Sequence, residues 1–336
     1  MKYKESLDKS KQYKETYLSG IYALIEKLQK ESSQKRDEFS KDILNNPQKY
    51  RNELKQILGW PLTEKNFPKS IECCSEALYE KDGMNVYRMS FEILDGIKLC
   101  GILIKKDDKK RPLVITQHGA LGSPECICGF YETTGNYNDF AERILNCDVN
   151  IFAPQLLIWD ENQYDVKFNR AIIDAKLKRL GSSIAAVELF GLMRIIDWFE
   201  EQSYAGNIGM AGLSYGGYYT MLLSAIEPRI KSAISCSFFC SGDVLREFCD
   251  IHYFDLGNKM SWAEIVSLVY PRHMYLAIGD EDVGFPFTQS QKEFKRLEEL
   301  CTAVGTDWVE FEVFHGNHEF IKDDALIKKM TSDLKR

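Results

Sequence analysis

The stretch Gly212-Leu213-Ser214-Tyr215-Gly216, with Gly217 after it, decides the fold of this 336-residue chain. A short apolar run with strand character, 208–211, precedes it, and an amphipathic helical run, 216–226, follows it. A strand that turns directly into a helix brings neighbouring side chains into collision, and glycines on both sides of the serine relieve it. The pattern predicts a nucleophile elbow, with Ser214 at the carboxyl end of a buried strand. The alternative is a glycine-rich turn without chemistry.

A serine hydroxyl is a weak nucleophile unless a base accepts its proton, and a carboxylate usually holds that base in place. His318 lies in a loop directly after the last predicted strand, and Asp282 lies directly after the predicted strand 274–278. The carboxyl ends of parallel strands share one edge of a sheet. We therefore expect Ser214, Asp282 and His318 to meet there as a catalytic triad.

Each partner of the serine has a neighbour that could replace it. Asp280 could orient the histidine in place of Asp282, and His315 could act in place of His318. The spacing of His315, His318 and Glu319 also invites a metal-site interpretation. Their loop contains a glycine and does not supply the helical face on which zinc proteases place two histidines, so we predict no metal here.

Around these motifs, short apolar runs alternate with amphipathic helical runs. The predicted strands are 87–94, 98–104, 113–116, 150–153, 208–211, 230–235, 274–278 and 308–314, and the predicted helices are 137–146, 184–201, 216–226, 288–303 and 323–334. This alternation predicts an α/β fold with a mostly parallel central sheet covered by helices on both faces. The first two strands, joined at Asp95-Gly96, predict an antiparallel hairpin at one edge.

The N-terminal part of the chain differs from the rest. Residues 7–58 have apolar residues at helical spacing, interrupted at Asn45-Asn46-Pro47. We expect a helical extension over 1–60, a linker over 61–85 and a catalytic domain over 86–336. Residues 1–60 carry 13 Lys and Arg against 9 Asp and Glu, whereas the remainder carries 30 against 41. A separate interaction module, driven by the lysine surplus, is the alternative for the extension.

Composition limits the possible partners and location. The hydrophobic fraction of 44% and charged fraction of 28% are typical of a globular protein. The acidic body argues against nucleic acid as a partner, and no apolar run reaches the roughly 18–20 residues of a membrane span. The ten cysteines and the polar N-terminal sequence predict reduced thiols and a cytoplasmic location. Cys126 and Cys128 lack a second close pair of ligands, so we predict no structural zinc.

In this order, the motifs resemble those of the α/β-hydrolase superfamily, and more narrowly the serine esterases similar to dienelactone hydrolase and acetyl xylan esterase. The resemblance runs from Tyr87 to the C-terminus. The order Ser214, Asp282, His318 is that of the superfamily. The stretch 279–286, which includes Phe285-Pro286, is similar to a family motif and favours Asp282 over Asp280.

The resemblance also implies an oxyanion hole. Residues 117–123 are similar to the family loop that follows the third strand, so Ala120 would supply one N–H donor and Tyr215 the other. Residues 317–320 resemble the family's GHEF ending, with Asn317 in place of glycine. The loop after Pro154 departs from the family, because related proteins often carry an aspartate and a glycine-arginine pair there. That departure concerns specificity more than reaction class.

These observations predict hydrolysis of a small-molecule carboxylic ester through an acyl-enzyme, without a metal or organic cofactor. Acetyl or other short acyl esters of a sugar are one candidate class, with Trp159, Phe238 and Phe285 as expected substrate contacts. A peptidase of the prolyl-oligopeptidase type is the main alternative, although about 86 residues before the domain are too few for its propeller. A non-catalytic binding protein on the same fold is a third. The sequence does not indicate the oligomeric state.

Overall fold

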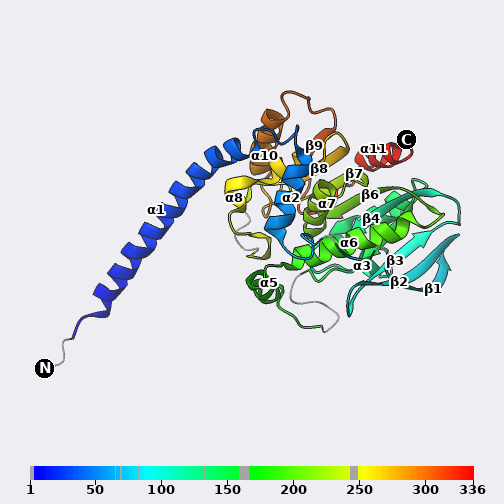
Figure 1. The fold of residues 1–336 in the computed structure, drawn as a ribbon, viewed down its shortest axis with the longest axis horizontal. Coiled ribbons are helices and arrows are strands. Elements are labelled where there is room, and N and C mark those ends of the chain that lie inside the picture. The colour runs from blue at the N-terminus through cyan, green and yellow to red at the C-terminus, as the bar shows by residue number, and fades with distance from the viewer. Residues whose placement is uncertain are drawn as a thin grey trace.

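The computed structural model describes residues 4–64, 66–68, 70–81, 83–131, 133–158, 166–242 and 249–336. Its centre is a single sheet (Figure 1) in which the strands follow the order β1-β2-β3-β5-β4-β6-β7-β8-β9. The strands are β1 Cys73–Lys81, β2 Met84–Leu94, β3 Ile97–Lys105, β4 Arg111–Gln117, β5 Asn150–Pro154, β6 Ala205–Leu213, β7 Ile230–Cys236, β8 His273–Gly279 and β9 Val309–Phe314. The pairs from β5 to β9 are parallel, and those among β1, β2, β3 and β5 are antiparallel.

Helices cover both faces of the sheet. The helices of the described chain, of which α1 projects away from the sheet, are α1 Leu7–Ser40, α2 Pro47–Leu58, α3 Pro124–Ile127, α4 Phe140–Leu145, α5 Arg170–Arg179, α6 Ile184–Glu200, α7 Tyr215–Ile226, α8 Leu256–Lys259, α9 Trp262–Ser267, α10 Phe287–Leu300 and α11 Ala325–Leu334. One apolar core joins the sheet to α2, α6, α7, α9 and α10, and a second joins it to α4 and α11. In β4, Leu113 and Ile115 face the first core and Val114 the second, which explains why such a strand is apolar throughout.

The predicted α/β class with a mostly parallel sheet is confirmed, and so is the hairpin. β2 and β3 turn at Asp95-Gly96, where Gly96 has a φ of 74°. The segment 61–85, which we expected to be a linker, instead contributes β1, the edge strand of the sheet. The reason is that Ser75, Glu76 and Glu80 give this strand a polar composition, which an exposed edge tolerates.

The helical N-terminal part consists of two unlike pieces. In α2, Tyr50, Leu54 and Leu58 are buried, and the Arg51 guanidinium donates to the carbonyl oxygens of Ala225 at 3.0 Å and Leu268 at 2.8 Å. In α1 the only buried residue is Ser40, and the helix projects away from the sheet (Figure 1). α2 therefore belongs to the body of the protein. No helix in the described part of the chain is both long and apolar enough to cross a membrane.

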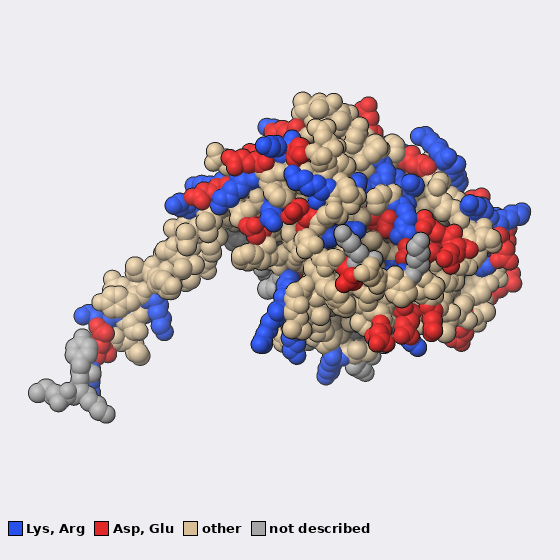
Figure 2. All heavy atoms as spheres, in the orientation of Figure 1, with Lys and Arg blue, Asp and Glu red and all other residues tan. Residues whose placement is uncertain are grey.

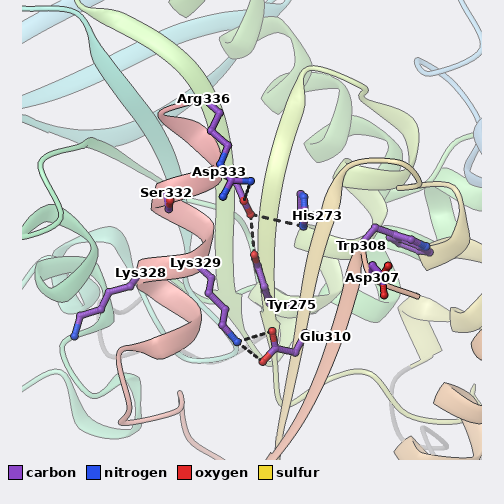
Figure 3. Close-up of a pocket in the computed structure, with 10 residues that line it drawn as sticks. All are labelled: His273, Tyr275, Asp307, Trp308, Glu310, Lys328, Lys329, Ser332, Asp333 and Arg336. Atoms are coloured by element: carbon purple, nitrogen blue, oxygen red, sulfur yellow. Dashed lines mark hydrogen bonds and ion pairs between the residues drawn. The ribbon is translucent and has the colours of Figure 1, made fainter. Parts of the chain in front are cut away.

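One carboxylate of the C-terminal helix α11 bonds to two strands of the sheet. Asp333 accepts hydrogen bonds from the hydroxyls of Tyr275, at 2.7 Å, and Ser232, at 3.1 Å, and its Oδ2 lies 3.9 Å from Nδ1 of His273. His273, Tyr275 and Asp333 line a cavity of about 430 Å³, where Figure 3 shows them. Because His273 is the first residue of β8, this cavity lies toward the amino ends of the strands, the opposite edge from Ser214.

Gly101 of β3 gives a test of how tightly the sheet and its neighbours pack. A Cβ at this position would lie 2.5 Å from Cζ of Phe152 and 2.6 Å from the carbonyl oxygen of Ala153. We expect Gly101→Val to lower the free energy of unfolding by about 1–3 kcal/mol or more, because neither the Phe152 ring nor the Ala153 backbone can move aside without straining the sheet. Gly257→Ala, where nothing lies within 4 Å, should change it by less than about 0.5 kcal/mol. Urea unfolding measures both, and equal effects would contradict the packing described.

Candidate active site

Ser214 occupies the turn between β6 and α7 in a strained backbone conformation. Its φ of 59° and ψ of −122° lie in a region of backbone angles that residues other than glycine rarely adopt. The Ser214 N–H donates to the carbonyl oxygen of Cys236 at 2.9 Å, and its carbonyl oxygen accepts from the N–H of Tyr218 at 3.0 Å. A Cβ on Gly212 would lie 2.4 Å from the carbonyl group of Gly216. The elbow predicted from the glycine spacing is therefore formed.

The loop after β4 passes directly beside the serine. A Cβ on Gly119 would lie 3.1 Å from Cβ of Ser214 and 2.7 Å from the carbonyl oxygen of Leu213. A Cβ on Gly216 would lie 2.2 Å from the carbonyl oxygen of Gln117. Only glycine permits these two approaches. They bring the backbone at Gly119, and with it the following residue Ala120, next to the serine at the N-terminal end of α7.

Asp282 and His318 are hydrogen bonded at the same edge of the sheet. His318 Nδ1 lies 2.8 Å from Oδ2 of Asp282, whose other oxygen accepts the N–H groups of Gly284 and Phe285, each at 3.0 Å. The Asp282 side chain is fully buried, whereas that of His318 is 36% exposed. The carboxylate is therefore held by three donors, and the imidazole it orients remains accessible.

The two alternatives form a separate pair. His315 Nδ1 lies 3.3 Å from Oδ2 of Asp280, and the His315 side chain is 82% exposed. A hydrogen bond from the N–H of Gly316, at 3.1 Å, and the bond to His315 lower the pKa of Asp280. Each aspartate thus pairs with a different histidine. The structure brings together Asp282 and His318, as we expected, and leaves the other pair in solvent.

One short segment, η1 Gly135–Tyr137 with the residue after it, holds both loops of the site. The Tyr137 hydroxyl accepts the N–H of Gly119 at 2.9 Å, and the loop folds so closely around it that a Cβ on Gly122 would lie 2.1 Å from the hydroxyl oxygen. The Asn136 amide donates to the carbonyl oxygen of His318 at 3.0 Å, and Asn138 donates to that of Phe320 at 2.7 Å. Sequence reasoning missed these residues, and their only signal was a polar run at the start of the predicted helix 137–146.

His118 is a buried neutral histidine that joins two loops. Its Nδ1 lies 2.9 Å from the carbonyl oxygen of Gly119, and its Nε2 accepts the N–H of Leu156 at 3.2 Å. Burial lowers the pKa of His118 to about 4, so the ring is neutral at pH 7 with its proton on Nδ1. It therefore connects the loops that follow β4 and β5.

A buried network of charges includes Tyr215, the residue after Ser214. Arg170 of α5 donates to Asp250 at 2.7 Å and to Glu188 of α6 at 3.1 Å, and Tyr215 of α7 donates its hydroxyl to Asp250 at 2.7 Å. Burial opposes the positive charge, but the two carboxylates outweigh it and raise the pKa of Arg170. Glu188 also accepts the N–H of Leu157, at 2.9 Å, and so ties the loop after β5 into the network. We did not predict it, although Glu188 is the one charged residue in the stretch 184–193 of a predicted helix.

The three expected substrate contacts have different outcomes. Phe238 is fully buried and packs on Tyr218, Trp262 and Phe285 with ring centroids 5.2–5.3 Å apart, so it offers no surface to a substrate. Its position in a predicted loop was misleading, because the segment after β7 folds inward. Phe285 is 3% exposed and stacks on the His318 ring at 5.2 Å. Trp159 lies outside the described residues.

The cysteines in the described part of the chain are free thiols. Burial raises the pKa of Cys73 to about 11 and that of Cys240 to about 12, so neither is a reactive thiolate at neutral pH. Within the described ranges, no three His, Cys, Asp or Glu side chains converge in a group that could hold a metal ion.

The low pKa of His118 predicts a loss of stability in acid. Its folded value of about 4 lies below the unfolded value of about 6.5, so the unfolded chain binds the proton more readily. Its contribution is complete above pH 6.5 and is lost as the pH falls toward 4, a change of about 3 kcal/mol. We expect His118→Asn to flatten the decline of unfolding free energy between pH 7 and 4, measured by urea unfolding.

The matched control is His315→Asn, which removes an exposed imidazole. This variant should keep the wild-type dependence on pH. If both variants followed the wild-type curve, the buried neutral state of His118 would be excluded as a cause.

The sequence matches no protein-family model and no curated protein sequence. Solved structures match over most of their length. A protein of Bacteroides fragilis assigned as an acetyl xylan esterase shares 15% identity, with coverage of 84% of this chain and 77% of that one and a TM-score of 0.66. The glucuronoyl esterase of Solibacter usitatus shares 13% identity over 84% and 91%, with a TM-score of 0.63. Acetyl xylan esterase 1 of Thermoanaerobacterium shares 14% over 87% and 94%, with a TM-score of 0.55. At this identity the likeness establishes the fold, and the chain has the α/β-hydrolase fold of these esterases.

Proposed function

We propose that this protein is a serine hydrolase of carboxylic esters that uses Ser214, His318 and Asp282. The observation that carries the proposal is the strained backbone of Ser214, on the same sheet edge as a buried carboxylate bonded to an accessible imidazole. Strain of this kind persists where surrounding structure enforces it, and it concentrates at functional sites. The other pair that has an accessible imidazole and a largely buried acid, His273 and Asp333, is 3.9 Å apart and lies at the opposite edge of the sheet from Ser214.

In the proposed first step, the Ser214 hydroxyl oxygen attacks the ester carbonyl carbon while Nε2 of His318 accepts the hydroxyl proton. Asp282 holds the proton of Nδ1 and stabilises the imidazolium. The imidazolium then donates its Nε2 proton to the departing alkoxide, which leaves as an alcohol. Water, deprotonated by the same imidazole, cleaves the acyl-enzyme and releases the carboxylic acid.

The negative oxygen formed during each step needs hydrogen-bond donors. We assign these to the N–H groups of Ala120 and Tyr215. Gly119 lies against Ser214 and places Ala120 at its side, and Tyr215 opens α7, whose N-terminal end favours negative charge. Loss of one such donor typically lowers turnover about 10²–10³-fold.

The proposed substrate is a small carboxylic ester, with carbohydrate esters as the leading class. Two of the similar structures are named acetyl xylan esterases and one a glucuronoyl esterase. We also propose that the protein is similar to dienelactone hydrolases and that it is cytoplasmic. The free thiols favour a reducing compartment. All proposed catalytic residues lie within 86–336, the range we assign to the catalytic domain.

Paired substitutions test the triad. We expect Ser214→Ala, His318→Asn and Asp282→Asn each to lower kcat for p-nitrophenyl acetate by about 10³–10⁴-fold, because the nucleophile, its base or the tautomer is lost. The matched controls His315→Asn and Asp280→Asn should stay within about threefold of wild type, since that pair lies in solvent. Circular dichroism checks the fold of every variant.

The same proteins decide between the alternatives. If the protein turned over an aminoacyl-nitroanilide faster than acetate esters, its activity would be that of a peptidase and not of an esterase. Absence of fluorophosphonate labelling at Ser214, together with no turnover of acetylated sugars or short acyl esters, would overturn the proposal in favour of a binding protein.

Tyr137 is proposed as a positioning residue for the oxyanion loop. Tyr137→Phe leaves the N–H of Gly119 without its acceptor and frees the loop that carries Ala120. We expect kcat to fall about 10–100-fold with KM changed less than threefold, because the loss is confined to the transition state. Tyr131→Phe, at a partly exposed position, should leave both constants unchanged. A change in KM alone, with kcat retained, would exclude this role.

A further inference from the structure

Helix α1 is far longer than its contacts with the body require. Its 34 residues span about 51 Å at the rise of an α-helix, yet only Ser40 is buried. It touches the body near its C-terminal end, where Arg36 donates to the carbonyl oxygen of Gly257 at 2.5 Å and Asp37 pairs with Arg296 at 2.8 Å. A helix of natural sequence gains most of its stability from packing of an apolar face. The rest of α1 has no such packing within the described chain.

The middle of α1 has the composition of an interface. No charged residue occurs between Glu15 and Glu26, and the intervening stretch contains Tyr17, Leu18, Tyr22, Leu24 and Ile25, which are 43–74% exposed. Figure 2 shows this stretch as a tan band, without charged residues, between the charged ends of the projecting arm. Depletion of charge together with enrichment in tyrosine marks the centre of protein–protein interfaces.

The apolar side chains form a continuous stripe, which we call the α1 seam: Tyr17, Ile21, Leu24 and Leu28. Their spacing of four, three and four residues places them on one face and matches the repeat of paired helices. The described part of the body does not cover this face, where Tyr17, Leu24 and Leu28 are 47–74% exposed. The face turned toward the body carries Tyr22, Ile25 and Gln29, about a quarter turn away, and even there a cavity of about 610 Å³ intervenes.

The exposed area approaches the size that an interface needs. Seven apolar side chains between Tyr13 and Leu28 are 43–74% exposed, and five of them lie outside the face turned toward the body: Tyr13, Tyr17, Leu18, Leu24 and Leu28. Since a large apolar side chain presents about 150–250 Å² in full, these five amount to about 400–700 Å². A standard interface buries about 600–1,000 Å² on each partner, and the largest apolar patch of a monomer, about 300–600 Å², is often functional.

The charges of α1 identify the kind of partner. The helix carries seven Lys and Arg against six Asp and Glu, with both signs at both ends. Helices that lie on membranes are rich in Lys and Arg, and a strongly charged partner would demand the opposite sign. A nearly neutral helix that carries both positive and negative side chains at each end can pair with a second copy of itself without net electrostatic repulsion. A two-fold pair uses the same patch on both subunits, which the α1 seam provides.

We propose that α1 pairs with α1 of a second copy of this chain through the seam Tyr17–Leu28, so that the protein is a homodimer joined by its projecting arms. The seam buries the aromatic and aliphatic side chains of both helices. The α/β bodies then lie outside this contact, and each keeps its own candidate active site.

Light scattering after size exclusion tests the dimer on the full chain. Wild type at about 20 µM should elute at twice the chain mass. Leu24→Glu places a charge in the seam and should raise the dimer dissociation constant at least about 100-fold, giving the monomer mass. Ser19→Glu adds the same charge on the opposite side of the same helix and should remain dimeric. Circular dichroism should give a folded body for both variants.

Each other result overturns the proposal. A monomeric wild type, or an assembly of another mass, excludes the α1 pair. Equal dissociation by Ser19→Glu and Leu24→Glu excludes the seam as its contact. A monomeric wild type that binds phosphatidylserine vesicles, with binding lost in Leu24→Glu, assigns α1 to a membrane surface instead.

Discussion

The site depends on a steric constraint: at three points, two stretches of backbone approach each other more closely than any side chain permits. Gly216 lies against the carbonyl oxygen of Gln117, Gly119 against the turn at Ser214, and Gly279 against Gly316. Each contact joins the end of one strand to the end of another. Because a single Cβ at these points would separate the loops, the relative positions of Ser214, His318 and the loop at Gly119 follow from the absence of side chains.

Polar groups then hold the loops that the glycines bring together. His118 connects the loops after β4 and β5, Tyr137 accepts the N–H of Gly119 in the loop after β4, and Asn136 binds the loop that carries His318. Asp282 uses both carboxylate oxygens, one for the imidazole and one for two backbone N–H groups. Each of these side chains bonds to backbone groups of a loop, and such bonds limit how far the loop can move.

Features that depend on local pattern could be predicted from the sequence. The apolar strands, the elbow at Ser214 and the loops with Asp282 and His318 all follow from spacing of a few residues. Features that depend on distant partners could not. β1 is polar because it is an edge strand, Phe238 turns inward because three aromatic rings meet it, and Arg170 finds Glu188 and Asp250 from other elements. The same limit hid the difference between α2, which is packed, and α1, which is not.

Tyr215 belongs to two systems at once. Its backbone begins the helix behind Ser214, and its hydroxyl binds Asp250, which through Arg170 and Glu188 is joined to Leu157 in the loop after β5. Because the network meets this loop at the backbone N–H of Leu157, any residue except proline at position 157 can keep that hydrogen bond. Side chains in the loop can therefore vary while its backbone stays tied to the helix that follows Ser214.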